Sequence, residues 1–336
     1  MKRKGDLYAE IYSLTNLRAA YTRVLRNHSW DEKVLDFAEN FEENLAEIQE
    51  AFIKRDFKLG NYSQFIVFEP KKRIIHAAPV RERVMHHAVI GVTGWILERP
   101  LIADTYACRK NFGQWKAVFR AKDFASRFKW CLKLDIRHYF DSVDHELLFA
   151  MLKRLFKEEA LLDFWHELIW TYEVEKGKGL PIGNLTSQYL ANLYLNPCDR
   201  FLQGKHRGYL RYMDDMLVFG NYEDLKKLKR EVAIFVGEKL KLEIKHGGSL
   251  HRAREGVDFL GCRIYPGKIA LNKRSVRRFE RKLKIYTNEL KMGALSREKF
   301  AKRTQALISF TDKTDALSLR RKIITKILGP YSNQGC

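Results

Sequence analysis

The sequence contains no CxxC pair and no long apolar run. Its five cysteines are scattered singly, at Cys108, Cys131, Cys198, Cys262 and Cys336. This spacing disfavours a structural zinc site, and the odd number of cysteines is typical of a reducing compartment. The first residues, MKRKGDLYAEIYSL, are basic and then amphipathic rather than continuously apolar. We therefore expect a cytoplasmic protein without a secretory leader or a membrane anchor.

Several common catalytic signatures are also absent. No Walker A sequence occurs, His166-Glu167 lacks the second histidine of HExxH, and Gly177-x-Gly179 lacks the third glycine of a dinucleotide site. There is no internal repeat, low-complexity tract or long Pro/Ser linker. We therefore expect lobes that are continuous with one another rather than separate modules on linkers.

Positive charge is what the sequence has in excess. Among 336 residues, 62 Lys and Arg face 41 Asp and Glu, a formal net charge of +21. A composition of 46% hydrophobic and 31% charged residues indicates a folded chain. The charge favours a polyanionic partner, nucleic acid ahead of membrane, although a merely solubilising surface charge is the alternative.

Hydrophobic periodicity predicts the main elements. Spacings of three and four predict amphipathic helices, whereas short apolar runs between turn residues predict strands. The predicted helices cover 31–55, 81–97, 115–127, 144–156, 222–240 and 273–291, and the predicted strands include WCLKLDI, KLEIKHGG and VDFLGCRIY.

The stretch RYMDDMLVF places two acidic residues inside an apolar run. Its bulky and β-branched residues predict a pair of short strands, with Asp214 and Asp215 at the bend between them. Two adjacent carboxylates repel each other, and a divalent cation would relieve the repulsion. A metal site is therefore the sharper hypothesis, and an ordinary Asp turn is the alternative.

A second acidic residue ends another predicted strand. In KLDIRHYFDSVDH, Asp135 follows an apolar run and precedes the aromatic pair Tyr139-Phe140. If the two strands lie side by side, Asp135 and Asp214 present carboxylates at one end of one sheet. Two magnesium ions roughly 4 Å apart could be held there, as phosphoryl transfer requires.

Seven segments, in this order, resemble the successive motifs of reverse transcriptases: KKRIIHA, YACRKNFGQ, LKLDIRHYFDSVDH, GLPIGNLTSQYLANLYL, RYMDDMLVF, KLEIKHGG and VDFLGCRIY. The resemblance implies an α+β right-hand polymerase fold with fingers, a palm of antiparallel sheet plus helices, and a helical thumb. The expected boundaries are 1–130 for the N-terminal helices and fingers, 131–144 for the palm strand with the first Asp, 145–180 for fingers and palm helices, 181–268 for the palm, and 269–336 for the thumb.

The resemblance also implies an RNA-directed DNA polymerase with two Mg²⁺ ions, for which Mn²⁺ can substitute. Asp135 and Asp214 match the aspartates that ligate both ions, and Asp215 matches the more peripheral second Asp of the motif. The carbonyl of Ile136 would complete one coordination sphere. Phe140 matches the aromatic steric gate that selects deoxynucleotides.

Cations in two further blocks match residues that hold phosphates. Lys71, Lys72 and Arg73 lie on the fingers hairpin that grips the incoming triphosphate, and Arg73 aligns best. Arg109 and Lys110 are expected to hold template or triphosphate, with exposed loop charges as the alternative.

The predicted helix 273–291 has an apolar stripe and a strongly basic remainder. We expect its Arg274, Arg277, Arg278 and Arg281 to contact nucleic-acid phosphates, together with Gln188 in an earlier block. A solvated basic face or a membrane-surface helix are the alternatives.

One block departs from the common pattern of reverse transcriptases. Most have a Gln before the glycine, whereas this chain has Ile182-Gly183 and then Gln188, a form that resembles diversity-generating retroelements. That family copies a template-repeat RNA into cDNA with errors at adenines, using a pentameric accessory variability protein. We expect Ile182 and Gly183 to line the dNTP pocket, where Ile182 loosens checking of the base pair. Simple packing of Ile182 beneath the fingers is the alternative.

Two other functions remain open on the sequence. One is another bacterial reverse transcriptase, of the retron, group II-like or phage-defence kind. The other is a non-catalytic RNA-binding scaffold, which the intact Asp135, Asp214 and Asp215 disfavour.

Overall fold

The computed structural model describes residues 3–28, 31–68 and 72–329, and the chain divides into two compact units. Unit 1 comprises Met1–Arg109, Asp135–Leu202 and Glu231–Gly247, and unit 2 comprises Lys110–Leu134, Gln203–Arg230 and Gly248–Cys336. Two helices, α10 (Asn196–Lys205) and α11 (Tyr222–Leu240), begin in one unit and end in the other.

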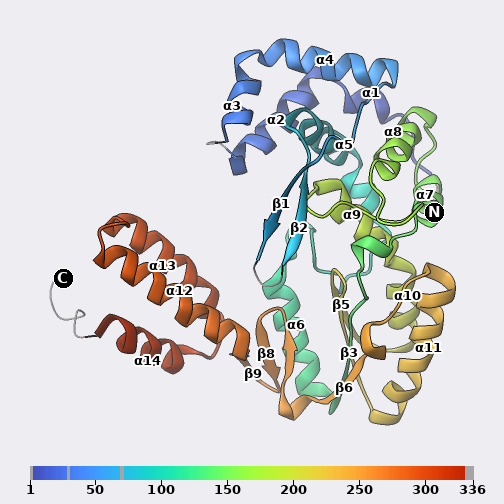
Figure 1. Ribbon diagram of the computed structural model, residues 1–336. Helices are drawn as coiled ribbons and strands as arrows, with labels where there is room; N and C mark the ends of the chain where they lie inside the picture. Colours follow the sequence, from blue (N-terminus) through green and yellow to red (C-terminus); the bar gives the residue numbers. More distant parts are fainter. Residues whose placement is uncertain (1–2, 29–30, 69–71, 330–336) are drawn as a thin grey trace. The chain divides into compact units, whose positions relative to one another are not determined.

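Unit 1 is mostly helical. Its elements are α1 (Tyr8–Ile11), α2 (Leu14–His28), α3 (Glu32–Glu39), α4 (Phe41–Lys54), β1 (Ser63–Val67), β2 (Arg73–Ala77), α5 (Val80–Glu98), the 3₁₀ turn η1 (Phe140–Ser142), α7 (His145–Lys153), α8 (Glu159–Trp170), α9 (Leu185–Tyr194) and η2 (Lys245–Gly247). Helix α5 packs against α2 and α9 and buries most of its residues, such as Val84, Met85 and Ala88. Figure 1 shows β1 and β2 as a hairpin that extends from these helices.

Unit 2 contains two antiparallel sheets and four helices of its own. Its elements are α6 (Gln114–Arg127), β3 (Trp130–Leu134), β4 (Gly208–Tyr212), β5 (Asp215–Gly220), β6 (Ser249–Arg252), η3 (Ala253–Glu255), β7 (Val257–Phe259), β8 (Cys262–Tyr265), β9 (Lys268–Leu271), α12 (Lys273–Lys291), α13 (Arg297–Asp312) and α14 (Leu317–Leu328). The larger sheet has the strand order β4-β5-β3-β6, and the smaller has β7-β8-β9. The mixture of helices and antiparallel sheets makes the fold α+β, as predicted.

The three C-terminal helices pack on the apolar stripe that the sequence predicted. Phe279 and Leu283 of α12 are buried in one cluster with Ile323 of α14, and α13 packs beside both helices (Figure 1). Helix α12 begins where the side chain of Asn272 accepts a hydrogen bond from the Ser275 N–H at 2.9 Å, a normal N-cap.

Three predictions about elements were wrong in detail. The single helix expected over 31–55 is two helices separated at Asn40. The expected strand KLEIKHGG forms only an isolated bridge at Ile244, because Lys241 and His246 adopt the left-handed φ values of 52° and 50° that strands cannot accommodate. VDFLGCRIY is two strands, since the chain turns at Leu260 and Gly261 with φ values of 49° and 82°.

Helices α5, α11 and α12 have 19 residues each, the length at which a membrane crossing must be considered. Across the described residues, none of the helices combines that length with the apolar character a bilayer crossing requires.

Candidate active site

The predicted acidic bend is a two-residue turn between β4 and β5. Met213 and Asp214 form the turn, and Tyr212 pairs with Asp215 across it. Met213 has φ 55°, a left-handed conformation that costs a non-glycine residue about 1–2 kcal/mol. The fully buried Arg211 donates from Nη1 to the Met213 carbonyl at 2.9 Å. A buried guanidinium thus holds a strained turn in place.

An amine from the neighbouring strand lies beside the second carboxylate. Lys133 Nζ is 3.1 Å from Asp215 Oδ1, and it donates to the carbonyl of Asp258 at 2.7 Å. Both Lys133 and Asp215 have side chains that are 27% exposed, so water screens their attraction only in part. The ammonium therefore offsets some of the repulsion between Asp214 and Asp215. Sequence reasoning missed this role, because Lys133 stands out in no pattern.

In unit 1, Asp135 has a similar cationic neighbour. Lys245 Nζ is 3.6 Å from Asp135 Oδ2, and the Lys245 N–H donates to the Asp135 carbonyl at 2.8 Å. Ile136 forms an isolated antiparallel bridge with Ile244. The backbone around Asp135 is therefore fixed by the segment that follows α11.

The pairing of β3 with β5 shows at which end of the sheet the chain reaches Asp135. In unit 2, Leu134 is the last residue of β3 and pairs with Met216 of β5. Strand β3 thus ends at the end of the sheet that carries Met213 and Asp214, and Asp135 is the next residue of the chain.

The donor chemistry of these aspartates fits Mg²⁺, which prefers carboxylate oxygens. Over 3–28, 31–68 and 72–329, no group of three or more His, Cys, Asp or Glu side chains is gathered closely enough to hold a metal ion. The positive charges beside Asp215 and Asp135 are the amines of Lys133 and Lys245.

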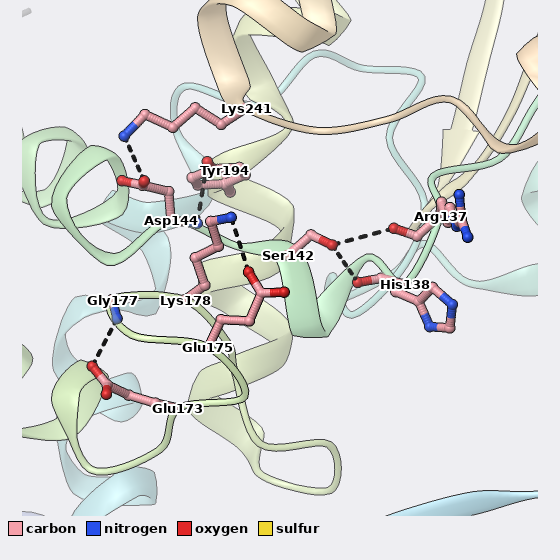
Figure 2. Close-up of polar contacts among 10 residues, drawn as sticks. All are labelled: Arg137, His138, Ser142, Asp144, Glu173, Glu175, Gly177, Lys178, Tyr194 and Lys241. Atoms are coloured by element: carbon pink, nitrogen blue, oxygen red, sulfur yellow. Dashed lines mark hydrogen bonds and ion pairs between the residues drawn. The ribbon is translucent and has the colours of Figure 1, made fainter.

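Hydrogen bonds hold the backbone around Phe140, the predicted steric gate. The Phe140 carbonyl accepts a hydrogen bond from the Leu180 N–H at 2.8 Å. The Ser142 hydroxyl donates to the His138 carbonyl at 3.0 Å (Figure 2), and the Tyr139 hydroxyl donates to the Ala191 carbonyl. The aromatic ring of Phe140 remains partly exposed. Its backbone is therefore held while its side chain stays accessible.

Asp144 anchors the same segment to α7 and to Lys241, the residue that follows α11. One carboxylate oxygen accepts from the Leu147 N–H at 2.9 Å, which caps α7, and the other is 2.6 Å from Lys241 Nζ (Figure 2). Burial by itself would raise the pKa of Asp144. The hydrogen bonds from Lys241 and the Leu147 N–H outweigh burial, so the pKa lies below its ordinary value of 3.8.

The predicted fidelity residue lies against the β1–β2 hairpin. The Ile182 carbonyl accepts from the His76 N–H of β2 at 2.8 Å. Gly183 has φ 121°, and a Cβ there would lie 2.6 Å from Cγ2 of Ile75. The absence of a side chain at Gly183 thus permits the close approach of the hairpin. Phe140 and Ile182 are connected through the short segment 180–182.

Two of the predicted triphosphate cations, Lys72 and Arg73, lie at the start of β2, at the far end of this hairpin. Lys72 and Arg73 are exposed, whereas Lys71 lies outside the described residues. The structure therefore leaves Lys72 and Arg73 accessible to a ligand at the hairpin.

Arg109 has a bracing role that the sequence did not predict. Its Nη1 donates to the carbonyls of Ile102 and Thr105, both at 2.8 Å, and its Nε is 3.6 Å from Glu98. The side chain is only 11% exposed. It was missed because two of its partners are backbone carbonyls, which leave no signal in residue types. The neighbouring Lys110 is exposed.

The remaining predicted nucleic-acid contacts lie on α9 and α12. Gln188 Oε1 accepts a hydrogen bond from the Cys108 thiol at 3.0 Å. On α12, Arg274, Arg277 and Arg281 are exposed, and the guanidinium of Arg278 lies 5.8 Å from the ring centroid of Phe310.

Comparison with known protein families shows which family the chain belongs to. Residues 70–264, more than half of the sequence, match the family described as reverse transcriptase (RNA-dependent DNA polymerase). The chain belongs to the reverse transcriptase family. Family members use an RNA template, dNTPs and divalent metal ions, and carboxylate oxygens such as those of Asp135 and Asp214 are suitable ligands for such ions.

Relatives in this family are distant. The chain is 21% identical over 247 residues to a putative COX1/OXI3 intron 2 protein of Saccharomyces cerevisiae, matching 54% of the chain and 29% of that protein. It is 23% identical over 241 residues to protein YkfC of Escherichia coli, with 58% and 63% covered. With the group II intron-encoded protein LtrA of Lactococcus lactis it shares 21% identity over 220 residues, with 44% and 37% covered. The chain thus spans less than two thirds of each relative.

A solved structure supports the fold assignment. Apo telomerase from Candida tropicalis aligns with a TM-score of 0.51 at 12% identity, covering 84% of this chain and 64% of that one. At this identity the likeness concerns the fold alone.

Replacing Gly183 by Ala tests the close approach of the hairpin. The new methyl group would meet Ile75, in a backbone conformation that disfavours side chains, so we expect the free energy of unfolding to fall by about 1–3 kcal/mol. Gly204→Ala is the matched control, since a Cβ there meets nothing within 4 Å. Urea denaturation measures both variants. Equal stability of the two would show that the hairpin does not lie against Gly183.

Replacing Asp144 by Asn tests the anchor of the gate segment. The variant keeps a capping oxygen but loses the charge that pairs with Lys241, so we expect it to be less stable at pH 7 by about 1 kcal/mol. Because the folded pKa is depressed, this stabilisation is complete above pH 3.8 and is lost as the pH falls through the folded pKa.

Urea denaturation of wild type and Asp144→Asn between pH 7 and the acid limit of folding measures the effect. Glu175→Gln, which breaks a more exposed pair with Lys178, is the control and should change little. A stability difference that persists unchanged at low pH would contradict the assignment.

Proposed function

We propose that the chain is an RNA-directed DNA polymerase that acts by nucleotidyl transfer at Asp135 and Asp214. One observation carries the proposal. The Asp214-Asp215 turn lies at the end of the sheet where β3 leads into Asp135, within residues that match the reverse transcriptase family. Two-metal phosphoryl transfer requires carboxylates that share metal ions, and this order of strand, turn and aspartates supports assigning that role to Asp135 and Asp214.

Asp135 and Asp214 would hold two Mg²⁺ ions, with Asp215 and the Ile136 carbonyl as further ligands. Such ions lower the pKa of an attacking hydroxyl and neutralise charge on the leaving pyrophosphate. Before the ions bind, Lys133 and Lys245 balance the carboxylate charge at 3.1 and 3.6 Å.

Phe140 would select deoxynucleotides, since its braced backbone fixes where the ring can lie and a ribose 2′-hydroxyl would meet the ring. Lys72 and Arg73, exposed on the hairpin, would contact the triphosphate through charge-assisted hydrogen bonds. The bond from His76 to the Ile182 carbonyl would carry any movement of the hairpin to the nucleotide pocket.

The finer proposal is copying of a template-repeat RNA into cDNA with errors at adenines, as in diversity-generating retroelements. Ile182 supports it, since an apolar side chain beside the pocket cannot hydrogen-bond a base pair as a glutamine could. The proposed partners are the structured template RNA and the pentameric accessory variability protein. The proposed fingers, palm and thumb occupy the residue ranges that the resemblance to reverse transcriptases implies.

A second candidate is a group II-like reverse transcriptase. The similarity to the group II intron-encoded protein LtrA and to the yeast intron protein favours it. A neighbouring template and variable repeat pair in the genome would support diversification, whereas a flanking self-splicing intron would support this alternative.

Replacing Asp214 by Asn tests the chemistry. Loss of a shared metal ligand should lower the rate of Mg²⁺-dependent cDNA synthesis by about 10³-fold or more, because each ion loses a negative oxygen. Primer extension on an RNA template measures the rate. Asp36→Asn, an exposed aspartate of α3, is the control and should leave the rate unchanged. Full activity of Asp214→Asn would rule out the proposed centre.

Replacing Ile182 by Gln tests the fidelity hypothesis. A glutamine would restore a polar contact near the nascent base pair, so misincorporation opposite template adenines should fall by roughly tenfold, the effect of about 1.4 kcal/mol. Sequencing of the cDNA measures it, with Ile53→Gln, a 60% exposed isoleucine, as control. An unchanged error spectrum in Ile182→Gln would leave Ile182 a packing residue only.

A further inference from the structure

The end of the four-stranded sheet opposite the Asp214 turn carries features that the proposed catalysis does not use. Antiparallel pairing puts the starts of β3 and β4 and the ends of β5 and β6 together there. Figure 1 shows β3 and β6 side by side. Since β5 runs from Asp215 to Gly220, this end lies about 17 Å from the turn, at 3.3 Å per residue.

Three side chains form a stack at this end, here called the distal platform: Trp130, Tyr222 and Arg252. Trp130 pairs with Gly220 on one side and with Arg252 on the other. The Trp130 ring meets the ring of Tyr222 at a centroid distance of 4.7 Å. The guanidinium of Arg252 lies 5.2 Å from the Trp130 ring centroid.

The platform is accessible to a ligand. Tyr222 is 38% exposed, the Arg252 side chain is 47% exposed, and Trp130 is partly exposed. Aromatic rings left accessible at the surface, with a guanidinium stacked on one of them, suit the faces of unpaired nucleobases.

The segments around the platform carry an excess of positive charge. In 127–129, 205–207, 221–226 and 252–255 there are seven cations and three acids, namely Arg127, Lys129, Lys205, Arg207, Lys226, Arg252 and Arg254 against Glu223, Asp224 and Glu255. Glu255 is 3.8 Å from Arg252, a weak and exposed pair that leaves the local charge positive. The surroundings are thus suited to a phosphate backbone.

We propose that the distal platform binds single-stranded RNA, stacking an unpaired base on Tyr222 and Trp130 while the surrounding cations contact phosphates. The choice of RNA rests on the proposed function. A reverse transcriptase pairs its DNA product with the template, so the strand that remains unpaired outside the active centre is RNA. The platform would then hold template RNA away from the aspartates.

Crosslinking locates the bound strand directly. The full-length protein binds a primed template whose RNA overhang, about 20 nucleotides, exceeds the roughly 4–16 nucleotides that one single-strand site covers. 5-Bromouridine is placed in the RNA overhang or, in a second arm, in the DNA primer. After irradiation, mass spectrometry should find RNA crosslinks at Trp130 or Tyr222 and none from the primer.

Binding measurements then test the contribution of each side chain. Tyr222→Leu should weaken binding of the overhang RNA roughly 5- to 150-fold, the range for losing one stacked base. Arg252→Gln should reduce the slope of log affinity against log salt by about 0.7, the value for one phosphate contact with a single strand. Both positions are partly exposed, and thermal unfolding confirms that each variant is folded.

Tyr12→Leu, directly after α1, and Lys54→Gln, on α4, are the matched controls in unit 1 and should bind RNA as the wild type does. The proposal is overturned if the platform variants bind like these controls, if no crosslink reaches the platform, or if the primer DNA crosslinks there instead of the RNA.

The polymerase function and the RNA-binding role of the distal platform can be rejected independently of each other. Crosslinking needs neither Mg²⁺ nor dNTPs, so platform crosslinks in a protein that makes no cDNA would reject only the polymerase function. Active cDNA synthesis without platform crosslinks would reject only the platform.

Discussion

The strained turn at Met213 and Asp214 is the constraint on which the proposed centre depends. A left-handed Met213 would relax if nothing held it, and the fully buried Arg211 holds it by donating to its carbonyl. Burying a guanidinium is costly unless it is hydrogen-bonded, so Arg211 and the turn stabilise each other. Lys133 adds a charge beside Asp215 and connects the turn to Asp258 of β7. The position of the Asp214 and Asp215 carboxylates is therefore determined by the packing of unit 2.

A second constraint lies in unit 1, around the residues proposed to line a nucleotide pocket. The short segment 180–183 bonds to the Phe140 carbonyl on one side and to His76 on the other, each at 2.8 Å. Phe140, Ile182 and the hairpin are thus related by backbone hydrogen bonds, which depend little on side-chain identity.

The sequence predicted an element correctly where residue chemistry or hydrophobic periodicity within a few neighbouring residues indicated it. The acidic bend at Asp214 and the helix from Tyr222 to Leu240 were predicted correctly, because adjacent carboxylates and a spacing of three and four are visible in a few residues. It failed at KLEIKHGG, where left-handed residues interrupt an apparent strand. The roles of Arg109 and Arg211 could not be predicted, since their partners are backbone carbonyls that only the fold brings within reach.

The central claim is that Asp135 and Asp214 bind two divalent ions. The ions would take the place of the lysine ammonium groups that lie beside Asp135 and Asp215. Anomalous diffraction from crystals of the protein soaked in Mn²⁺ with primer, template and an unreactive dNTP analogue measures this most directly. The account predicts two manganese peaks bound by Asp135 and Asp214, with the amines of Lys133 and Lys245 displaced from the carboxylates. Crystals with the analogue bound but without manganese at these aspartates would contradict it.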